Sequence, residues 1–530
     1  MQFKHKATFT AVAAALGTVG TAGTAHAFLP WVTTPDSEVF ISGASAPSNM
    51  QRETVINNLC DPGLGAIDVF VDVVKTAPVG TTVLLAHTEQ WAVACRAKNN
   101  TTLGAAANTN ILVRKSDVNG SGNGTTPVAN AVPVNFMVLS AGGCATSGTN
   151  GAFRLDGGNY TYRTCTTVAA QAPDAGTSDI EPAMFTGELA PPSGDFVKPA
   201  SNWAEKDLAG LVFGVVVSTG MRNELQTDQV AAGILPASCV AGNETEACMP
   251  SLPSSYVASV FSGKVQDWDD MPIYGQSLTG ANALPDPAGA DASETVNGTA
   301  YSYDWSAGDV NICRRWTGSG THAQHMVHYF DKNCEDGTSS MVGQPGGASL
   351  FFPNVVENSS SGNLDDCMTA IANGTSLSST SVTPNINGSY TGWAIGYQSL
   401  EKNVTGSKPY RYVKIDGIAP TLKNAISGDY PQVYYVTMQW RTTGYVNSGL
   451  RLDATPNVAG INAVLNAVSN LNTASIENIN DGFVYSFGRS GFVKPTAGAS
   501  TLYTVGTPNT PWARRDAANN PDSCKALQKL

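Results

Sequence analysis

The sequence is poor in charged residues and has no excess of basic ones. Only 14% of its 530 residues are Asp, Glu, Lys or Arg, against about 25% in an average globular chain. Lysine and arginine number 30 against 42 aspartates and glutamates, which gives a formal net charge of −12. Nucleic acids and anionic membranes are bound by clustered basic side chains. The composition therefore argues against polyanion binding and, taken alone, disfavours any anionic ligand.

Several motifs of enzymes and metal proteins are also absent from the sequence. No Cys-x-x-Cys pair points to a zinc ribbon or a thioredoxin-like site, and no Gly-x-Ser-x-Gly marks a nucleophile elbow. The glycine-rich stretch 119–124 lacks the Lys-Ser/Thr of a nucleotide-binding loop. His322, His325 and His328 recur at every third residue, but steps of three drift around a helix and no Cys or carboxylate accompanies them. We expect no catalytic residue, no cofactor and no metal site.

The N-terminus has the pattern of a secretory signal. Lys4 and Lys6 precede an apolar run at 7–20, and residues 25–27 read Ala-His-Ala, a small-x-small cleavage pattern. The apolar run is too short to span a membrane. We expect residues 1–27 to be a signal peptide and the mature chain to be periplasmic or extracellular, without stable membrane insertion.

Cysteines are numerous, and all of them follow this signal. An even number in an exported chain indicates disulfides, here five. The sequence does not fix their pairing, but Cys144 with Cys165 and Cys239 with Cys248 would each close a short loop. The ten cysteines are Cys60, Cys95, Cys144, Cys165, Cys239, Cys248, Cys313, Cys334, Cys367 and Cys524.

The mature chain begins with a unit suited to binding an anion. Residues 38–41 read as a β-strand, 42–48 as a turn of small residues, and the following stretch to residue 59 as a helix. Ser45 or Ser48 is a candidate cap for that helix, and helix N-termini present unpaired N–H groups to anions. Alternation of strands and helices continues along the chain. The pattern predicts an α/β fold, and the length predicts two large domains or one two-lobed body.

The most specific motif lies at residues 313–321, which read Cys-Arg-Arg-Trp-Thr-Gly-Ser-Gly-Thr and lead into a helix. Arginine offers a planar, permanently charged group that matches phosphate or carboxylate oxygens. Hydroxyls of Ser319 and Thr321 and the backbone at Gly320 follow Arg315 where the helix begins. One oxyanion could therefore receive charge, hydroxyl donors and N–H donors together.

Six segments in chain order resemble the periplasmic phosphate-binding proteins of ABC transporters, which have the type II substrate-binding-protein fold. Residues 42–46 resemble their opening Gly-Ala-Gly-Ala loop, and residues 315–321 resemble their Arg-x-Asp-Gly-Ser-Gly-Thr loop. The other four segments are 120–122, 177–179, 256–268 and 392–397. The resemblance implies an α/β fold of two lobes with mixed sheets, here with disulfide-stapled insertions. We assign residues 28–215 to lobe I, 216–400 to lobe II, and 401–530 to a return to lobe I plus a C-terminal extension.

The resemblance also implies a ligand and residue roles. Inorganic phosphate would lie between the lobes of a monomer, with an ABC permease as a further partner, and no chemical turnover would follow. A carboxylate accepts a hydrogen bond from a protonated oxyanion and repels sulfate, which is fully deprotonated. The resemblance implies that Ser121 donates a hydroxyl hydrogen bond from lobe I and that Ser319, Gly320 and Thr321 donate from lobe II. Arg315 would supply the charge, and Asp179 would accept the proton of the ligand.

Two positions depart from the family pattern. Pro47 and Ser48 stand where the family has Thr-Phe, so the first hydroxyl contact moves to Ser45 or Ser48 or is lost. Thr317 replaces the aspartate that steadies the arginine. Two alternatives therefore stay open: a secreted surface or matrix protein that reuses the fold for adhesion or assembly, and a phosphatase-like enzyme that uses the same anion pocket.

Overall fold

The computed structural model describes most of the chain. The described residues are 28–73, 75–79, 82–87, 89–98, 109–150, 158–287, 289–332, 354–388, 390–442, 458–469, 473–494, 511–513 and 528–529. The expected signal peptide, Cys334 and Cys524 lie outside them.

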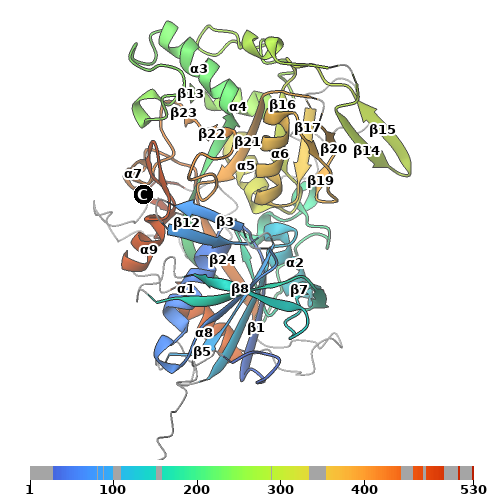
Figure 1. Cartoon of the computed structure of the whole chain (residues 1–530), viewed down its shortest axis with the longest axis vertical. Coiled ribbons are helices and arrows are strands. Elements are labelled where there is room, and N and C mark those ends of the chain that lie inside the picture. The colour runs from blue at the N-terminus through green and yellow to red at the C-terminus, as the bar shows by residue number, and fades with distance from the viewer. Residues whose placement is uncertain are drawn as a thin grey trace, which may run out of the picture.

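Two lobes lie end to end, and the lower one in Figure 1 holds the N-terminal strands. Its sheet places β1 between two parallel neighbours, β6 and β11, and continues through β5, β2, β9 and β8. The strands of this lobe I sheet are β1 (Ser37–Gly43), β2 (Asp68–Val71), β5 (Gln90–Arg96), β6 (Asn110–Ser116), β8 (Cys144–Asn150), β9 (Tyr160–Cys165) and β11 (Ala175–Ser178).

The sequence of β1 explains its central place. β-Branched and aromatic residues suit a strand, and Val39 and Ile41 are buried in the lobe I core. Helix α1 (Ser48–Thr54) follows, as predicted, and continues as a π-helix over Val55–Leu59. Helix α8 (Val458–Ser469) packs on the same core, so a segment late in the sequence returns to this lobe.

Two long antiparallel strands join the lobes. Strand β12 (Trp203–Ser218) pairs with β24 (Val433–Arg441) along most of its length, with a register shift between Asp207 and Gly210. On its far side β24 pairs with β11 of lobe I, whereas the C-terminal half of β12 pairs with β21 (Ala394–Ser399) of lobe II. Both strands therefore belong to both lobes.

Lobe II is the upper body in Figure 1. Strand β16 (Asn311–Arg315) runs parallel to β17 (Asn354–Asn358) and β21, with β19 (Val382–Thr383) at the edge. The amphipathic helix expected after residue 252 is α4 (Ser254–Phe261), and Gly263, with φ +74°, lies just beyond its end. The other long helices are α3 (Thr219–Ala231), α5 (Gly320–Phe330) and α6 (Ser361–Asn373).

The C-terminal region packs against lobe II after leaving α8. Helix α9 (Thr473–Asn480) precedes a hairpin of β25 (Val484–Tyr485) and β26 (Gly488–Arg489), and β27 (Phe492–Val493) pairs with β12. The remaining short elements are β3 (Lys75–Val79), β4 (Thr82–Ala86), α2 (Thr126–Asn130), β7 (Val134–Met137), β10 (Val168–Gln171), β13 (Ser251–Leu252), β14 (Ala292–Val296), β15 (Thr299–Tyr303), β18 (Ser376–Leu377), β20 (Asn385–Asn387), β22 (Tyr410–Tyr412), β23 (Lys414–Ile415), α7 (Leu422–Ser427), β28 (Trp512–Ala513) and β29 (Gln528–Lys529).

Four disulfides lie within the described residues. Cys144–Cys165 and Cys239–Cys248 confirm the two pairings expected from their short loops. The other two, Cys60–Cys95 and Cys313–Cys367, tie elements farther apart in the sequence. The predicted class, a two-lobed α/β fold with mixed sheets and disulfides, is confirmed.

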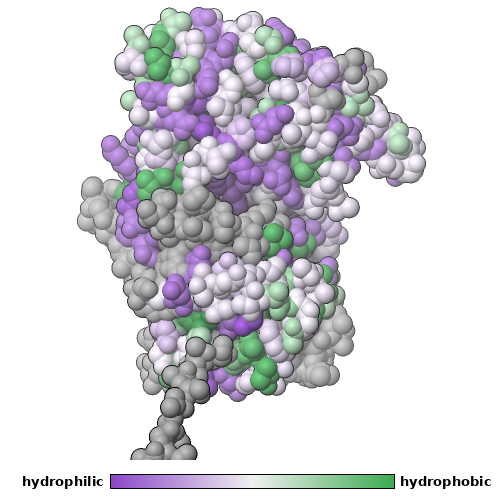
Figure 2. Space-filling model, viewed as in Figure 1, coloured by the Kyte–Doolittle hydropathy of each residue, from purple (hydrophilic) through white to green (hydrophobic). Residues whose placement is uncertain are grey.

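Hydrophilic residues gather on the face of lobe II seen in Figure 2, and hydrophobic residues form small separate patches there. Among the described residues, no helix combines the length and the apolar character needed to cross a membrane.

Candidate functional site

The lobe I side of the candidate site consists of two turns that follow parallel strands. Ser121 lies in the short 3-10 helix Gly120–Gly124, which follows β6, and Asp179 lies directly after β11. The Ser121 hydroxyl accepts a hydrogen bond from the Asp179 backbone N–H at 3.1 Å. Both side chains are buried. The packing of β6 and β11 on either side of β1 therefore brings these two predicted residues into contact.

The lobe II side is the loop from β16 to α5. Arg315 is the last residue of β16, and Gly318, with φ +79°, turns the chain so that α5 begins at Gly320. Ser319 caps this helix, its hydroxyl accepting from the His322 N–H at 3.4 Å. Thr321 accepts from the Arg315 guanidinium at 3.5 Å. The predicted residues of this loop thus surround one helix N-terminus.

The two sides are in direct contact. The Gly122 N–H of lobe I donates to the Gly318 carbonyl of lobe II at 2.7 Å. A Cβ atom added to Gly320 would lie 2.3 Å from the Ser121 hydroxyl and 2.8 Å from the Asp179 Cβ, far inside normal contact. Only glycine fits at this position while the lobes are together. Ser121, Asp179 and Gly320 are therefore neighbours in space, although they are distant in the sequence.

Burial strongly perturbs the two charged groups of the site. Desolvation raises the pKa of the Asp179 carboxyl to about 7, against the attraction of Arg315 and Lys115, which lowers it. Its Oδ1 has no hydrogen-bond partner among the described residues. Desolvation also lowers the pKa of Arg315 to about 10, so the guanidinium stays charged at neutral pH. Asp179 is thus a buried carboxyl with a free oxygen that takes up or releases a proton near pH 7.

Neutral oxygen atoms hold Arg315 in place. Its guanidinium donates to the backbone carbonyls of Asn358 at 3.2 Å and Ser359 at 2.7 Å, and to the Ser361 hydroxyl at 2.9 Å. Within the described part of the chain no carboxylate lies within ion-pair distance of Arg315, whereas the preceding Arg314 pairs with Glu357 at 2.9 Å. The loss of an aspartate at Thr317 therefore leaves Arg315 well oriented and its positive charge without a partner.

The two candidates for the first hydroxyl contact have different surroundings. Ser45 Oγ lies 3.4 Å from Ser361 Oγ of lobe II, beside Arg315. Ser48 donates to Asp117 Oδ1 at 2.9 Å and accepts from Trp91 Nε1 at 2.8 Å, so its hydroxyl is used within lobe I. The structure brings Ser45 to the residues of lobe II, whereas the Ser48 hydroxyl is already paired with Asp117 and Trp91.

Sequence reasoning missed a buried cation next to the site. The Lys115 ammonium donates to the carbonyls of Gly43 at 2.9 Å and Ala44 at 3.1 Å and contacts the Asp117 carboxylate. It holds the turn after β1 and lowers the pKa of Asp179 through its charge. The signal was a Lys and an Asp directly after a predicted buried strand. Ser361 was missed as well, because only the parallel pairing of β16 with β17 brings it to Arg315.

His322 and His325 of α5 are buried, and His328 is half-buried. Burial lowers the pKa of His325 to about 3 and that of His328 to about 4. Burial and the neighbouring Arg314 charge also lower the pKa of His322 well below its usual value. No group of three His, Cys, Asp or Glu side chains that could hold a metal is found among the described residues. A cavity of about 10 Å³ lies beneath the site, lined by Phe261, Arg314, Arg315, Thr321, His322, His325 and Tyr397.

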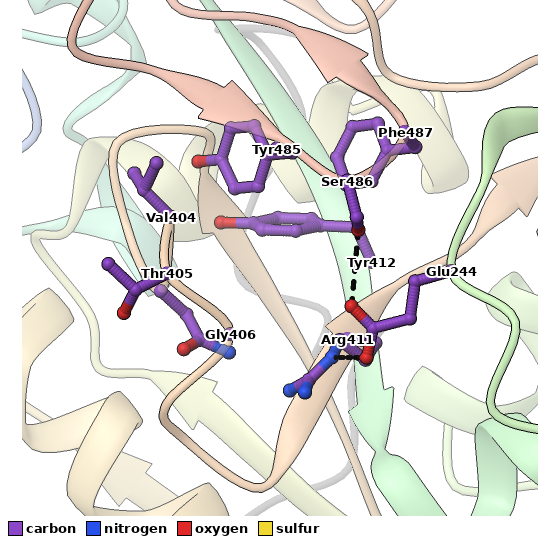
Figure 3. A pocket seen from close by; sticks show the side chains of 10 residues that line it. Glu244, Val404, Thr405, Gly406, Arg411, Tyr412, Tyr485, Ser486 and Phe487 are labelled. Atoms are coloured by element: carbon purple, nitrogen blue, oxygen red, sulfur yellow. Dashed lines mark hydrogen bonds and ion pairs between the residues drawn. The ribbon is translucent and has the colours of Figure 1, made fainter. Parts of the chain in front are cut away.

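A second cavity, of about 60 Å³, lies where the C-terminal hairpin meets lobe II, and none of the predicted residues lines it (Figure 3). The rings of Tyr485 and Phe487 stack at 4.8 Å, and Tyr412 meets both edge to face. Below them Glu244 binds Arg411 and accepts from the Ser486 hydroxyl at 3.1 Å. These contacts fasten the hairpin to lobe II.

Comparison with known proteins gives no match to a protein-family model and none to a curated protein. Three solved structures align with the chain over part of its length. The first, from Clostridium perfringens, is assigned as a phosphate ABC transporter substrate-binding protein and holds bound phosphate; it has a TM-score of 0.29 and 10% identity, covering 59% of this chain and 78% of that one. An ABC-type phosphate transport receptor from Vibrio cholerae has a TM-score of 0.24 and 12% identity, covering 52% and 71%. PstS from Borrelia burgdorferi has a TM-score of 0.24 and 10% identity, covering 60% and 79%.

Proposed function

We propose that this protein is an exported, non-enzymatic solute-binding protein that holds one inorganic phosphate ion between its lobes. The observation that carries the proposal is the electrostatic interaction of Arg315, which has no carboxylate within ion-pair distance among the described residues, with Asp179, whose buried Oδ1 has no hydrogen-bond partner among them. An unpaired buried charge is costly, and an anion would neutralise it. The hydroxyls of Ser121, Ser319 and Thr321 and the N-terminus of α5 surround the same place.

Asp179 supports phosphate over sulfate as the ligand. An ionised Asp179 accepts the proton that hydrogen phosphate carries, and sulfate carries none at neutral pH. Sulfate would therefore bring a lone pair against a buried carboxylate oxygen, which repels it. Arsenate shares the protonation chemistry of phosphate and would be accepted. The proposed selectivity is for a protonated tetrahedral oxyanion.

The proposal extends to the setting in which such a protein works. Disulfides form in oxidising compartments, and the four in the described residues support a periplasmic or extracellular location. Delivery of phosphate to an ABC permease is the corresponding role. Release requires the contact between Gly122 and Gly318 to break, which a hinge motion at β12 and β24 would do.

Titration calorimetry of the phosphate-free mature protein tests the proposal. We expect a saturable heat signal with phosphate and with arsenate at pH 7, and weaker binding of sulfate, with a difference that grows toward pH 8 as more of Asp179 is ionised. A flat phosphate titration with folded protein would contradict the proposed function. Equal binding of sulfate and phosphate would contradict the role of Asp179.

An assembly role remains the second candidate, because one observation favours it. The β14–β15 hairpin stands out from lobe II in Figure 1, and β15 is an edge strand of a four-stranded sheet. Edge strands can pair with another chain. Filaments or dimers that persist in a phosphate-free buffer, and that a proline at Ala300 abolishes, would favour this role.

A phosphatase-like enzyme receives less support. A serine nucleophile is activated by a base within hydrogen-bond reach. Ser48 and His87 both bind Asp117, through different oxygens, and the serine donates to the carboxylate rather than to the histidine. We therefore expect no product from phosphomonoesters.

A further inference from the structure

The first turn of α6 forms a wall of the candidate site that the sequence motifs do not include. Strand β17 lies beside β16, so its end and the start of α6 reach Arg315. Three acceptors of the Arg315 guanidinium come from this stretch, namely Asn358, Ser359 and Ser361. Ser359, Ser360 and Ser361 are all buried. Buried hydroxyls are normally hydrogen-bonded, so each of these three serines is expected to have a hydrogen-bond partner.

Two of these serines have roles within the helix. Ser360 caps α6 by accepting from the Asn363 N–H at 3.1 Å, and Ser359 accepts from the Asn363 side chain at 2.9 Å. Ser361 is different, because its hydroxyl oxygen accepts from Arg315 at 2.9 Å. A hydroxyl can accept and donate at the same time. The proton of Ser361 is therefore available to a further acceptor.

A hydroxyl of the other lobe lies close to Ser361. Ser45 Oγ lies 3.4 Å away, near the upper limit for a hydrogen bond and well beyond the usual 2.7–2.8 Å for two hydroxyls. The two serines therefore face each other across the junction of the lobes, beside the buried Arg315 guanidinium. At this distance the hydrogen bond between their hydroxyls is weak. An anion oxygen placed between them would accept from both and contact the Arg315 guanidinium.

We infer that Ser361, together with Ser45, forms an additional hydroxyl contact to a phosphate oxygen and so determines how tightly the closed site holds its ligand. This inference rests on the proposed phosphate-binding function. A donor polarised by a cation makes a stronger hydrogen bond to an anion than a neutral one does. Ser361 would thus couple the arginine of lobe II to the first turn of lobe I through the bound ion.

Calorimetry with inorganic phosphate on the wild type, Ser361→Ala and Ser361→Thr tests the inference. We expect Ser361→Ala to weaken phosphate binding about tenfold, since it removes one hydrogen bond to a charged group. Ser361→Thr keeps a hydroxyl at the first position of the helix and should restore most of the affinity. Ser490→Ala is the matched control, because Ser490 is a buried serine that donates to the Pro420 carbonyl away from the site, and it should bind like the wild type.

The outcomes separate the inference from the function on which it rests. Absence of phosphate binding by the folded wild type would overturn the proposed function itself. Wild-type binding with an unchanged Ser361→Ala variant would overturn the inference alone, and so would equal losses in the alanine and threonine variants, which would indicate packing. A Ser45→Ala, Ser361→Ala double variant that loses less than the product of the two single losses would support a shared phosphate oxygen.

Discussion

Arg315 is the residue on which most of the binding free energy should depend. Its guanidinium is buried, stays charged at neutral pH and is held only by neutral oxygens. An Arg fork gives two directed hydrogen bonds as well as charge, which a lysine cannot reproduce. The geometry is set by β16, β17 and α6 before any ligand arrives, so little order remains to be gained on binding.

We predict that Arg315→Ala lowers phosphate affinity by at least about a hundredfold, because two charge-assisted hydrogen bonds of about 1.5–3 kcal/mol each are lost. Arg315→Lys should recover only part of it. The ligand-free fold should lose stability as well, because the buried carbonyls of Asn358 and Ser359 lose their donor, and thermal unfolding without phosphate measures this cost. Wild-type phosphate affinity in Arg315→Ala would contradict this role.

The protonation state of Asp179 should affect both the stability of the ligand-free protein and its selectivity for phosphate over sulfate. Its pKa rises from 3.8 when unfolded to about 7 when folded, so the folded state binds more protons between these values. The contribution of Asp179 to the stability of the ligand-free protein is therefore fully present below pH 4 and is lost as the pH rises toward 7. The loss amounts to a few kcal/mol at most, on the order of 1.4 kcal/mol per unit of pKa shift.

We predict that Asp179→Asn removes this pH dependence and narrows the gap between phosphate and sulfate binding. Urea unfolding at pH 5 and pH 8 measures the first effect, and sulfate competition at pH 7 measures the second. A variant whose stability still falls between these pH values as in the wild type, or that excludes sulfate equally well, would contradict the assigned role of Asp179.

The sequence predicted the residues of the site that lie in local motifs and missed those that depend on strand pairing. Ser319 and Thr321 follow Arg315 on one loop, so their closeness in space follows from their closeness in the sequence. Ser361 is 46 residues beyond Arg315 and reaches it only through the parallel pairing of β16 with β17. Ser48 was an equal candidate to Ser45 in sequence, because nothing local shows that Asp117 takes its hydroxyl.

At the scale of elements, the N-terminus of α5 must approach the lobe I turn without any side chain between them. We predict that Gly320→Ala keeps each lobe folded but holds the lobes apart, since its Cβ would overlap the Ser121 hydroxyl. Phosphate affinity should fall at least tenfold, and small-angle scattering should report a larger radius of gyration. Gly142→Ala is the matched control, because a Cβ there meets nothing within 4 Å. Equal scattering and affinity in Gly320→Ala and the wild type would contradict this contact.

Disulfides give a second test at this scale. Cys313–Cys367 joins β16 to α6, the two elements that supply Arg315 and Ser361, and it spans 54 residues against 9 for Cys239–Cys248. The chain-entropy relation gives about 4 kcal/mol for the longer loop and about 2.5 kcal/mol for the shorter. We predict that alanine at both Cys313 and Cys367 lowers the urea midpoint more than alanine at both Cys239 and Cys248, and also weakens phosphate binding. The reverse order of midpoints would contradict the assignment.

At the scale of the whole molecule, three connections between the lobes lie within the part of the chain that the structure describes. Strands β12 and β24 are two of these connections. The sequence showed only an apolar run at 208–217 and did not predict that these strands pair with β21 of lobe II and β11 of lobe I. The C-terminal region is the third, because α8 packs on the lobe I core and the residues of α9 and the β25–β26 hairpin pack on that of lobe II. No motif marked this region, since its fit depends on surfaces formed by the rest of the chain.

Opening of the cleft should therefore strain the C-terminal connection as well as the hinge strands. The hairpin is fastened to lobe II by the packing of Tyr485 and Phe487 on Tyr412 and by the hydrogen bond from Ser486 to Glu244 (Figure 3). If this fastening limits how far the lobes part, then loosening it should let bound phosphate leave faster. The hydrogen bonds to the ligand would be unchanged, so the effect should be on dissociation rather than on selectivity.

We predict that Phe487→Ala raises the phosphate dissociation rate several-fold in stopped-flow exchange and leaves the ratio of phosphate to sulfate binding unchanged. Removing a buried phenyl ring also costs about 3–5 kcal/mol of stability, so a control of equal chemistry is needed. Phe136→Ala supplies it, because Phe136 packs on Phe40 at 5.1 Å within lobe I, away from the C-terminal hairpin. The two variants should lose similar stability, yet only Phe487→Ala should release phosphate faster. Equal release rates in both would show that the C-terminal region adds stability to lobe II without restraining the lobes.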